Sequence, residues 1–120
     1  MDILDVLFLL VVAHAVCDFV LQPEAMAMGK SRTDARHQHP GFPPWYIWLS
    51  AHALTHGGAV YLITGHLALG VVEVIIHLVI DWLKCEDKIG FHGDQGLHLL
   101  SKAVYVLSLI HISEPTRPQC

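Results

Sequence analysis

The sequence predicts an all-α polytopic membrane protein with about four transmembrane helices packed in a bundle. Of its 120 residues, 53% are hydrophobic and only 15% charged, and the mean hydropathy is +0.48. This balance is typical of membrane proteins rather than of soluble cores. Four segments approach the length of about 20 residues that crosses the hydrocarbon layer of a bilayer. Three of the four contain a pair of polar residues at a spacing of four, and such a pair also lies at the start of the fourth.

The first expected span covers residues 3–21. It has no Lys or Arg before it, no small-residue cleavage site and several polar groups inside it. We therefore interpret it as a retained span rather than a signal peptide. Residues 23–44 follow as a loop, because they hold basic residues and the turn-rich sequence HPGFPPW. Trp45, Tyr46 and Trp48 then begin the next span, where aromatic residues are typical of a membrane interface.

The second and third spans are predicted over residues 45–64 and 67–84. The very short TGH sequence between them predicts an antiparallel hairpin. The fourth span is expected over residues 97–112, after the polar segment KCEDKIGFHGDQG. Five of the 7 basic residues lie in the two longer connections, which share one side of the bundle. The positive-inside rule makes that side cytoplasmic and places the N-terminus outside.

The end of the chain requires a separate interpretation. Residues 107–117, LSLIHISEPTR, resemble the translation of a sequencing-library adapter. We expect residues 1–106 to form the membrane helical domain and residues 107–120 to be an artefactual tail. The alternative is a genuine fourth helix that ends at SEP. The polar residues of the tail receive no functional weight: His111, Arg117 and Cys120.

Charge and cysteine content exclude several classes of function. The formal net charge is -4 with histidine neutral, so no basic field indicates a nucleic-acid partner. The 3 cysteines are scattered without CxxC spacing, which argues against a disulfide framework or a cysteine-based zinc site. The anomaly is the presence of 10 histidines, most of them in or beside apolar segments.

Polar pairs recur with one spacing in every expected helix. Residues four apart lie on the same helix face, one turn from each other. Counted from the cytoplasmic ends at about 1.5 Å per residue, most pairs lie within two turns of a common depth. An ionisable group facing lipid costs at least about 2.5 kcal/mol, so these groups should turn inward and meet. The pairs are His14 and Asp18, His52 and His56, His77 and Asp81, and Asp94 and His98.

Imidazoles and carboxylates together form the ligand set of zinc, iron or manganese sites, which helix bundles commonly hold between facing helices. We interpret the eight residues as a ligand pool from which three or four bind one divalent cation. Asp18 and Asp81 are the candidates for a catalytic general base. A bound cation would also produce a hydroxide nucleophile near neutral pH. Two alternatives remain open: a polar layer that only fixes helix packing, and a proton or ion path.

Further polar residues are expected around this layer. Gln22 and Gln95 are interpreted as donors that orient the carboxylates or imidazoles. Glu73 extends the same face of the third span as a base or relay group, and it can form an ion pair with Lys102. Lys84 lies at the end of that span, where its ammonium group can reach the membrane interface.

Four short motifs occur in order between residues 4 and 106. They are AHAVCDFVLQP with the following Lys30, the histidine of LSAHALTH, HLVIDWLK, and DQGLH. With these motifs the chain resembles the domain of unknown function 3307 family of bacterial and phage membrane proteins. The resemblance implies a multi-pass protein of the bacterial cytoplasmic (inner) membrane and supplies no activity. The layout is also loosely similar to that of inner-membrane metal-dependent hydrolases.

The leading hypothesis is a membrane-embedded, metal-dependent hydrolase with its His/Asp cluster in the cytoplasmic half. A lipid-like substrate follows from the depth of the site. The expected partners are the lipid bilayer and this substrate, and the sequence does not give an oligomeric state. The alternatives are a small transporter or proton-relay protein, and a structural or regulatory membrane protein with a polar packing layer.

Overall fold

Helices make up most of the chain, and the part that the structure describes contains no strand. The computed structural model describes residues 2–113, and it confirms the all-α prediction. The artefactual tail expected over residues 107–120 stays a prediction, and residues 114–120 lie outside the described residues. The helices are α1 (Ile3–Ala15) with its π-helical continuation η1 (Val16–Val20), α2 (Glu24–Gly29), the 3₁₀-helix η2 (Ala35–Gln38), α3 (Trp45–Thr64), α4 (Leu67–Cys85) and α5 (Phe91–Ser113).

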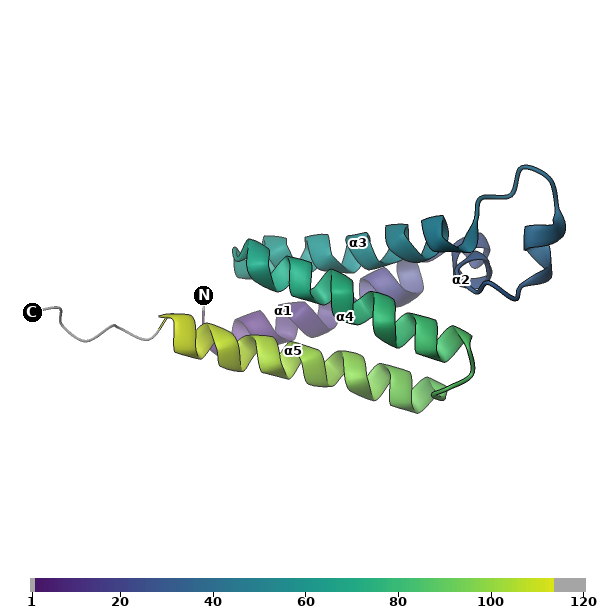
Figure 1. Cartoon of the computed structure of the whole chain (residues 1–120). Coiled ribbons are helices and arrows are strands. Elements are labelled where there is room, and N and C mark those ends of the chain that lie inside the picture. The colour runs from purple at the N-terminus through teal and green to yellow at the C-terminus, as the bar shows by residue number, and fades with distance from the viewer. Residues whose placement is uncertain (1, 114–120) are drawn as a thin grey trace, which may run out of the picture.

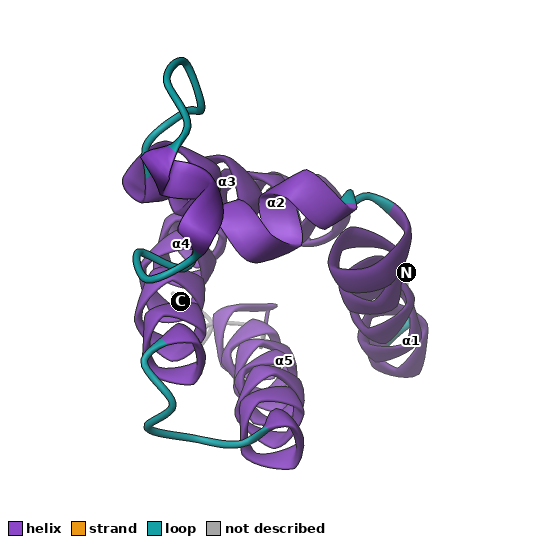
Figure 2. Ribbon diagram, turned by 90° about the vertical axis from the view of Figure 1, so that its right-hand side faces the viewer, coloured by secondary structure: helices purple, strands orange, loops and turns teal. Residues whose placement is uncertain are grey.

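The four long helices form an antiparallel bundle (Figure 1). Helix α1 packs against α3 and α5, and α4 packs against the same two helices, so the four surround a common interior (Figure 2). The N-terminus and the turn between α3 and α4 lie at one end of the bundle. The opposite end carries α2, η2 and the connection from α4 to α5. We call this the loop end.

The hairpin predicted for α3 and α4 is confirmed. Gly65 ends α3 with φ of 74°, a left-handed conformation that glycine adopts without steric cost. Glycine also allows the two helices to approach closely. A Cβ atom on Gly70 would lie 2.9 Å from the backbone oxygen of Gly57 and 2.9 Å from Cβ of Tyr61. The α3–α4 contact is therefore built from backbone as well as side chains.

Three local features differ from the expectations. The first expected span is not a uniform α-helix, because the amide of Leu21 donates to the carbonyl of Val16 at 2.8 Å in π-helical register. The segment expected as a loop contains α2 and η2, and α2 packs on α3 where Gly29 meets Trp48. Helix α5 begins at Phe91 rather than at residue 97, because the polar DQG segment continues the helix.

The described residues include an unusually large number of buried polar and charged side chains. Many large apolar side chains are exposed on the outer faces of the long helices; Leu62, for example, is 83% exposed. The interior holds a large set of buried polar and charged side chains, which we call the polar core: His14, Asp18, Lys30, His52, His56, Glu73, His77, Asp81, Asp94, His98, Ser101 and Lys102.

The apolar part of the interior lies toward the end of the bundle that carries the N-terminus. We call it the apolar plug, and its buried members are Val6, Leu10, Val60, Leu69, Tyr105, Val106 and Leu109. They come from all four long helices. The polar core and the apolar plug therefore follow one another along the bundle axis.

Within the described residues, one segment is long and apolar enough to cross a membrane by length and composition, Ile3–Val20, with a mean hydropathy of 2.3. A helix of this kind near the N-terminus is also typical of signal sequences and of buried helices in soluble proteins. Histidines lower the mean hydropathy of α3. Helix α4 carries three charged residues, which are Glu73, Asp81 and Lys84. The four-span arrangement stays a prediction.

Candidate metal centre

All eight residues of the predicted ligand pool lie in the polar core. Each is buried, with an exposed fraction of at most 8%. Each long helix contributes to the cluster, with η1 continuing α1. Ring contacts link the histidines across helices: centroids lie 3.7 Å apart for His56 and His77, and 4.2 Å apart for His77 and His98. The structure thus brings the pool together, and the metal-binding and catalytic roles of its members stay predictions.

Asp18 lies at the centre of the first group of side chains. His52 Nε2–H and His56 Nε2–H both donate to Asp18 Oδ1, at 3.0 and 3.1 Å. His77 Nε2 lies 3.9 Å from the same oxygen. One ligand atom from each of these four residues lies within 4.8 Å of the other three. We call this set the Asp18 group; three imidazoles and one carboxylate are a common donor set for divalent transition metals.

The tautomer of His77 follows from its partner. His77 Nδ1–H donates to Glu73 Oε2 at 3.2 Å, so the neutral ring carries its lone pair on Nε2. Nε2 is fully buried and has no hydrogen-bond partner among the described residues. It lies 3.7 Å from Asp81 Oδ2. A histidine whose distal N–H is held by a carboxylate is the usual arrangement of a metal-ligating imidazole.

Glu73 is fixed from three sides. Lys102 Nζ donates to its two oxygens at 3.0 and 3.1 Å, and Tyr105 Oη donates at 2.7 Å. The ion pair predicted between Glu73 and Lys102 is therefore confirmed. Tyr105 was not expected at the site; its place three residues after Lys102 on a helix was the available signal. The network makes Glu73 a buried acceptor for His77.

A second group is formed by Asp81, Asp94 and His98, whose ligand atoms also lie within 4.8 Å of one another. His98 Nε2 lies 3.3 Å from Asp94 Oδ1, yet neither atom has a hydrogen bond within the described part of the chain. His98 Nδ1 also lacks a partner there. We call this set the Asp94 group.

Lys30 is the charged residue of the cluster that sequence reasoning missed as a site residue. Its ammonium group donates to Asp81 Oδ2 at 2.7 Å, and both side chains are buried. Lys30 caps the C-terminus of α2, so this short helix carries it over the loop end of the bundle. Nearby, Arg32 makes a bidentate ion pair with Glu86 at 2.6 and 2.7 Å. The available signal was the position of Lys30 after the AHAVCDFVLQP motif.

The residues expected around the ligands take different places. Gln95 Nε2 donates to Asp18 Oδ2 at 2.9 Å and to Asp94 Oδ2 at 3.0 Å, while its oxygen accepts from His14 Nε2–H at 3.0 Å. Gln22 instead donates to the backbone carbonyl of Asp18 at 2.8 Å, so it supports the π-turn. Lys84 Nζ lies 3.8 Å from Asp94 Oδ2.

The charges of the polar core are unevenly paired. Glu73 and Asp81 each face a buried lysine, and Asp94 faces Lys84, whose side chain is 36% exposed. For Asp18, the ion pairs found among the described residues involve only histidines. A buried carboxylate without a full positive partner is costly in free energy. The Asp18 group therefore combines a metal-type donor set with a deficit of positive charge.

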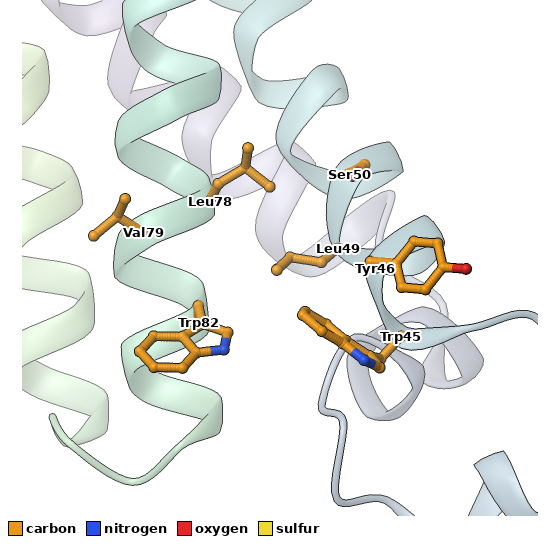
Figure 3. Close-up of a pocket in the computed structure, with 7 residues that line it drawn as sticks. All are labelled: Trp45, Tyr46, Leu49, Ser50, Leu78, Val79 and Trp82. Carbon is orange, nitrogen blue, oxygen red and sulfur yellow. The ribbon is translucent and has the colours of Figure 1, made fainter.

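An apolar groove lies between α3 and α4 near the loop end (Figure 3). Its volume is about 530 Å³. Trp45 and Trp82 face each other across it, and Leu49 and Leu78 line the space between the two helices. Two lining residues lie next to the cluster in the sequence, since Leu78 follows His77 of the Asp18 group and Trp82 follows Asp81 of the Asp94 group.

The fold and the cluster define an all-helical bundle with a buried histidine and carboxylate centre. The chain belongs to the family described as protein of unknown function (DUF3307), which matches residues 6–117. No curated protein and no solved structure matches the chain.

Proposed function

We propose that this chain is a polytopic membrane protein that binds a divalent cation in the Asp18 group and hydrolyses a lipid-like substrate. The observation that carries the proposal is the convergence of three imidazole Nε2 atoms on one oxygen of Asp18. One of these atoms, on His77, has a lone pair and no donor among the described residues. A divalent cation would satisfy that lone pair and the charge of Asp18 together.

Membrane insertion is supported by the distribution of polar and apolar side chains. Exposed apolar side chains cover the outer faces of the long helices, while carboxylates, lysines and histidines lie inside. Apolar side chains are stable in contact with lipid, whereas charged and polar side chains are stable only where they are shielded from it. The histidines and charges that lower the mean hydropathy of α3 and α4 belong to the polar core, so an average over each helix hides its apolar outer face. We infer four spans in the bacterial inner membrane, with the loop end cytoplasmic.

Hydrolysis is supported by the position of Asp81. Its Oδ2 lies 3.6 Å from His52 Nε2 and 3.7 Å from His77 Nε2, beside the atoms that would hold the cation. A bound divalent cation lowers the pKa of a coordinated water toward neutrality. With such a cation bound, Asp18 would serve as a ligand, and Asp81 would accept the proton of that water as general base. The groove beside Trp45 and Trp82 offers an apolar surface for an acyl chain.

A proton-relay protein is the second candidate, because hydrogen bonds and close ion pairs run from Tyr105 through Glu73 and His77 toward Asp81 and Lys30. The apolar plug argues against a complete path. Tyr105 itself packs among the plug residues, so the polar track ends inside the bundle. A polar track that ends inside the bundle suits an enzyme better than a channel or pump.

Metal content is the decisive measurement. The full chain is purified in detergent, and bound Zn, Fe and Mn are determined for the native protein and for His52→Ala/His77→Ala. We expect at least about one equivalent in the native chain and a loss of most of it in the variant. His92→Ala is the matched control, since His92 is exposed and lies outside both groups. Less than about a tenth of an equivalent in the native protein would refute the metal centre.

Membrane topology is tested separately. The native chain should remain in the membrane pellet after carbonate extraction. In a variant without the natural cysteines, His66→Cys should react with an impermeant maleimide from outside the cell. Thr33→Cys and Lys88→Cys should react only after permeabilisation, because both lie at the loop end. Release of the chain by carbonate would refute insertion, and labelling of the two ends from the same side would refute the topology.

Activity is tested with the metal-loaded chain in mixed micelles. The substrates are p-nitrophenyl esters and p-nitrophenyl phosphodiesters that carry a long alkyl chain. We expect release of p-nitrophenol from one of these classes, at a rate that falls at least about a hundredfold in Asp81→Asn. A fully metal-loaded protein that hydrolyses neither class would count against the hydrolase and leave the metal centre in place.

A further inference from the structure

We infer that the cluster holds two adjacent divalent cations rather than one, with the second cation bound by the Asp94 group. This inference rests on the proposed function, because it assumes a first cation in the Asp18 group. Asp81 is the carboxylate between the two positions. Its Oδ2 lies 3.6 and 3.7 Å from the Nε2 atoms of His52 and His77 in the first group, and Asp81 also belongs to the second.

His98 provides the independent observation for the second position. Its ring is fully buried, and neither of its nitrogens has a hydrogen-bond partner within the described residues. Either neutral tautomer of His98 therefore leaves one N–H and one lone pair without a partner. Buried polar atoms without a hydrogen-bond partner are rare in native proteins because they cost free energy. Asp94 Oδ1, 3.3 Å from His98 Nε2, is buried and unpartnered in the same region. The lone pairs of both residues are available to one cation.

The two groups are joined by their supporting residues as well as by Asp81. The amide nitrogen of Gln95 donates to Asp18 Oδ2 at 2.9 Å and to Asp94 Oδ2 at 3.0 Å. One side chain thus orients a carboxylate of each group, and it leaves Asp18 Oδ1 and Asp94 Oδ1 free of its own contact. Carboxylates shared between or fixed beside two ions are typical of centres in which the ions lie about 3.5–4 Å apart.

The two lysines near the second position make contacts with its carboxylates that are either long or displaceable. Lys84 reaches Asp94 only at 3.8 Å and is partly exposed. Lys30 donates to Asp81 from a short helix at the loop end, so its ammonium group can withdraw without rearranging the four long helices. A cation in the Asp94 group would replace the contact of Lys30 with Asp81. Lys30 is the group we expect to move when the second cation binds.

The test uses Mn²⁺ alone with the full chain in detergent. The protein is saturated with Mn²⁺ and desalted, and bound manganese is measured together with the electron paramagnetic resonance spectrum. We expect about two equivalents and the broadened spectrum of a magnetically coupled pair in the native chain. Asp94→Asn/His98→Phe should retain about one equivalent with the six-line spectrum of an isolated ion. His92→Phe, also on α5 but exposed, is the matched control and should behave like the native chain.

The outcomes separate this inference from the proposed function. About one equivalent in the native chain, with an uncoupled spectrum, would overturn the second cation and leave the Asp18 group standing. Two equivalents retained in Asp94→Asn/His98→Phe would overturn the assignment to the Asp94 group. Less than about a tenth of an equivalent in the native chain would remove both proposals. The native measurements decide the question even if the double variant does not fold.

Discussion

The buried ion pair between Glu73 and Lys102 makes a strong prediction about stability. Glu73 is 0% exposed and Lys102 is 1% exposed, and both carboxylate oxygens receive the ammonium group at 3.0 and 3.1 Å. Lys102→Met leaves a buried carboxylate whose remaining donors are Tyr105 and His77. Removing one partner of a buried pair costs about 3–5 kcal/mol in the free energy of unfolding. Glu73→Gln should cost a similar amount, because it leaves the buried ammonium group without its charge partner.

The double variant Glu73→Gln/Lys102→Met removes both charges, so it should cost no more than either single change. The expected coupling energy is therefore at least about 3 kcal/mol, the lower end of the cost of one single change. The assay is reversible denaturation in detergent micelles with chelator present, followed by tryptophan fluorescence. Lys88→Met, at an exposed position, is the control and should change stability by less than about 0.5 kcal/mol. If the cost of the double variant equals the sum of the two single costs to within about 0.5 kcal/mol, the two side chains do not interact and the predicted ion pair is refuted.

Three further predictions concern packing, thiol reactivity and ligand linkage. Gly70→Ala should lower stability by about 1–3 kcal/mol in the same denaturation assay, because its Cβ would meet the backbone of Gly57. Gly58→Ala, with nothing within 4 Å of its Cβ, should be neutral or stabilising, and equal costs for the two changes would contradict the close α3–α4 contact. Burial raises the pKa of the Cys85 thiol, so with the other cysteines replaced its maleimide labelling at pH 7 should be slower than that of a free thiol. The rate should increase as pH rises toward that pKa, and a pH-independent rate would contradict it. Mn²⁺ at about 100 times its dissociation constant should stabilise the chain by about 2.7 kcal/mol over the chelated form, seen as a higher melting temperature. An unchanged melting temperature would contradict binding to the folded state.

Regular features of the fold could be predicted from the sequence because each has a local cause. The long helices follow from the length of the apolar segments, and the α3–α4 turn follows from a glycine between two of these segments. The convergence of the polar pairs could be anticipated from their common spacing and depth, since polar groups in an apolar helix must find one another.

Other features depend on contacts that no local pattern encodes. The π-turn around Asp18 shifts one hydrogen bond by a single residue, and hydropathy does not distinguish that shift from a regular α-helix. Lys30 meets Asp81 across 51 residues of sequence, from a segment that composition alone assigns to a loop. Gln22 was expected to orient ligand side chains, but the π-turn brings a backbone carbonyl to it instead. In each case the tertiary arrangement decides which of several available partners is used.

The arrangement of counter-charges argues against a polar core that only fixes helix packing. Glu73 has a buried lysine, Lys102, at 3.0 Å, which is how a purely structural charge is usually neutralised. Asp18 is surrounded by imidazoles instead, and an imidazole balances a carboxylate fully only when it is protonated. The lone pair on His77 Nε2 in the same group also has no donor among the described residues. A divalent cation would resolve both difficulties at once, because neutral imidazoles are its preferred nitrogen ligands and its charge would compensate the carboxylate.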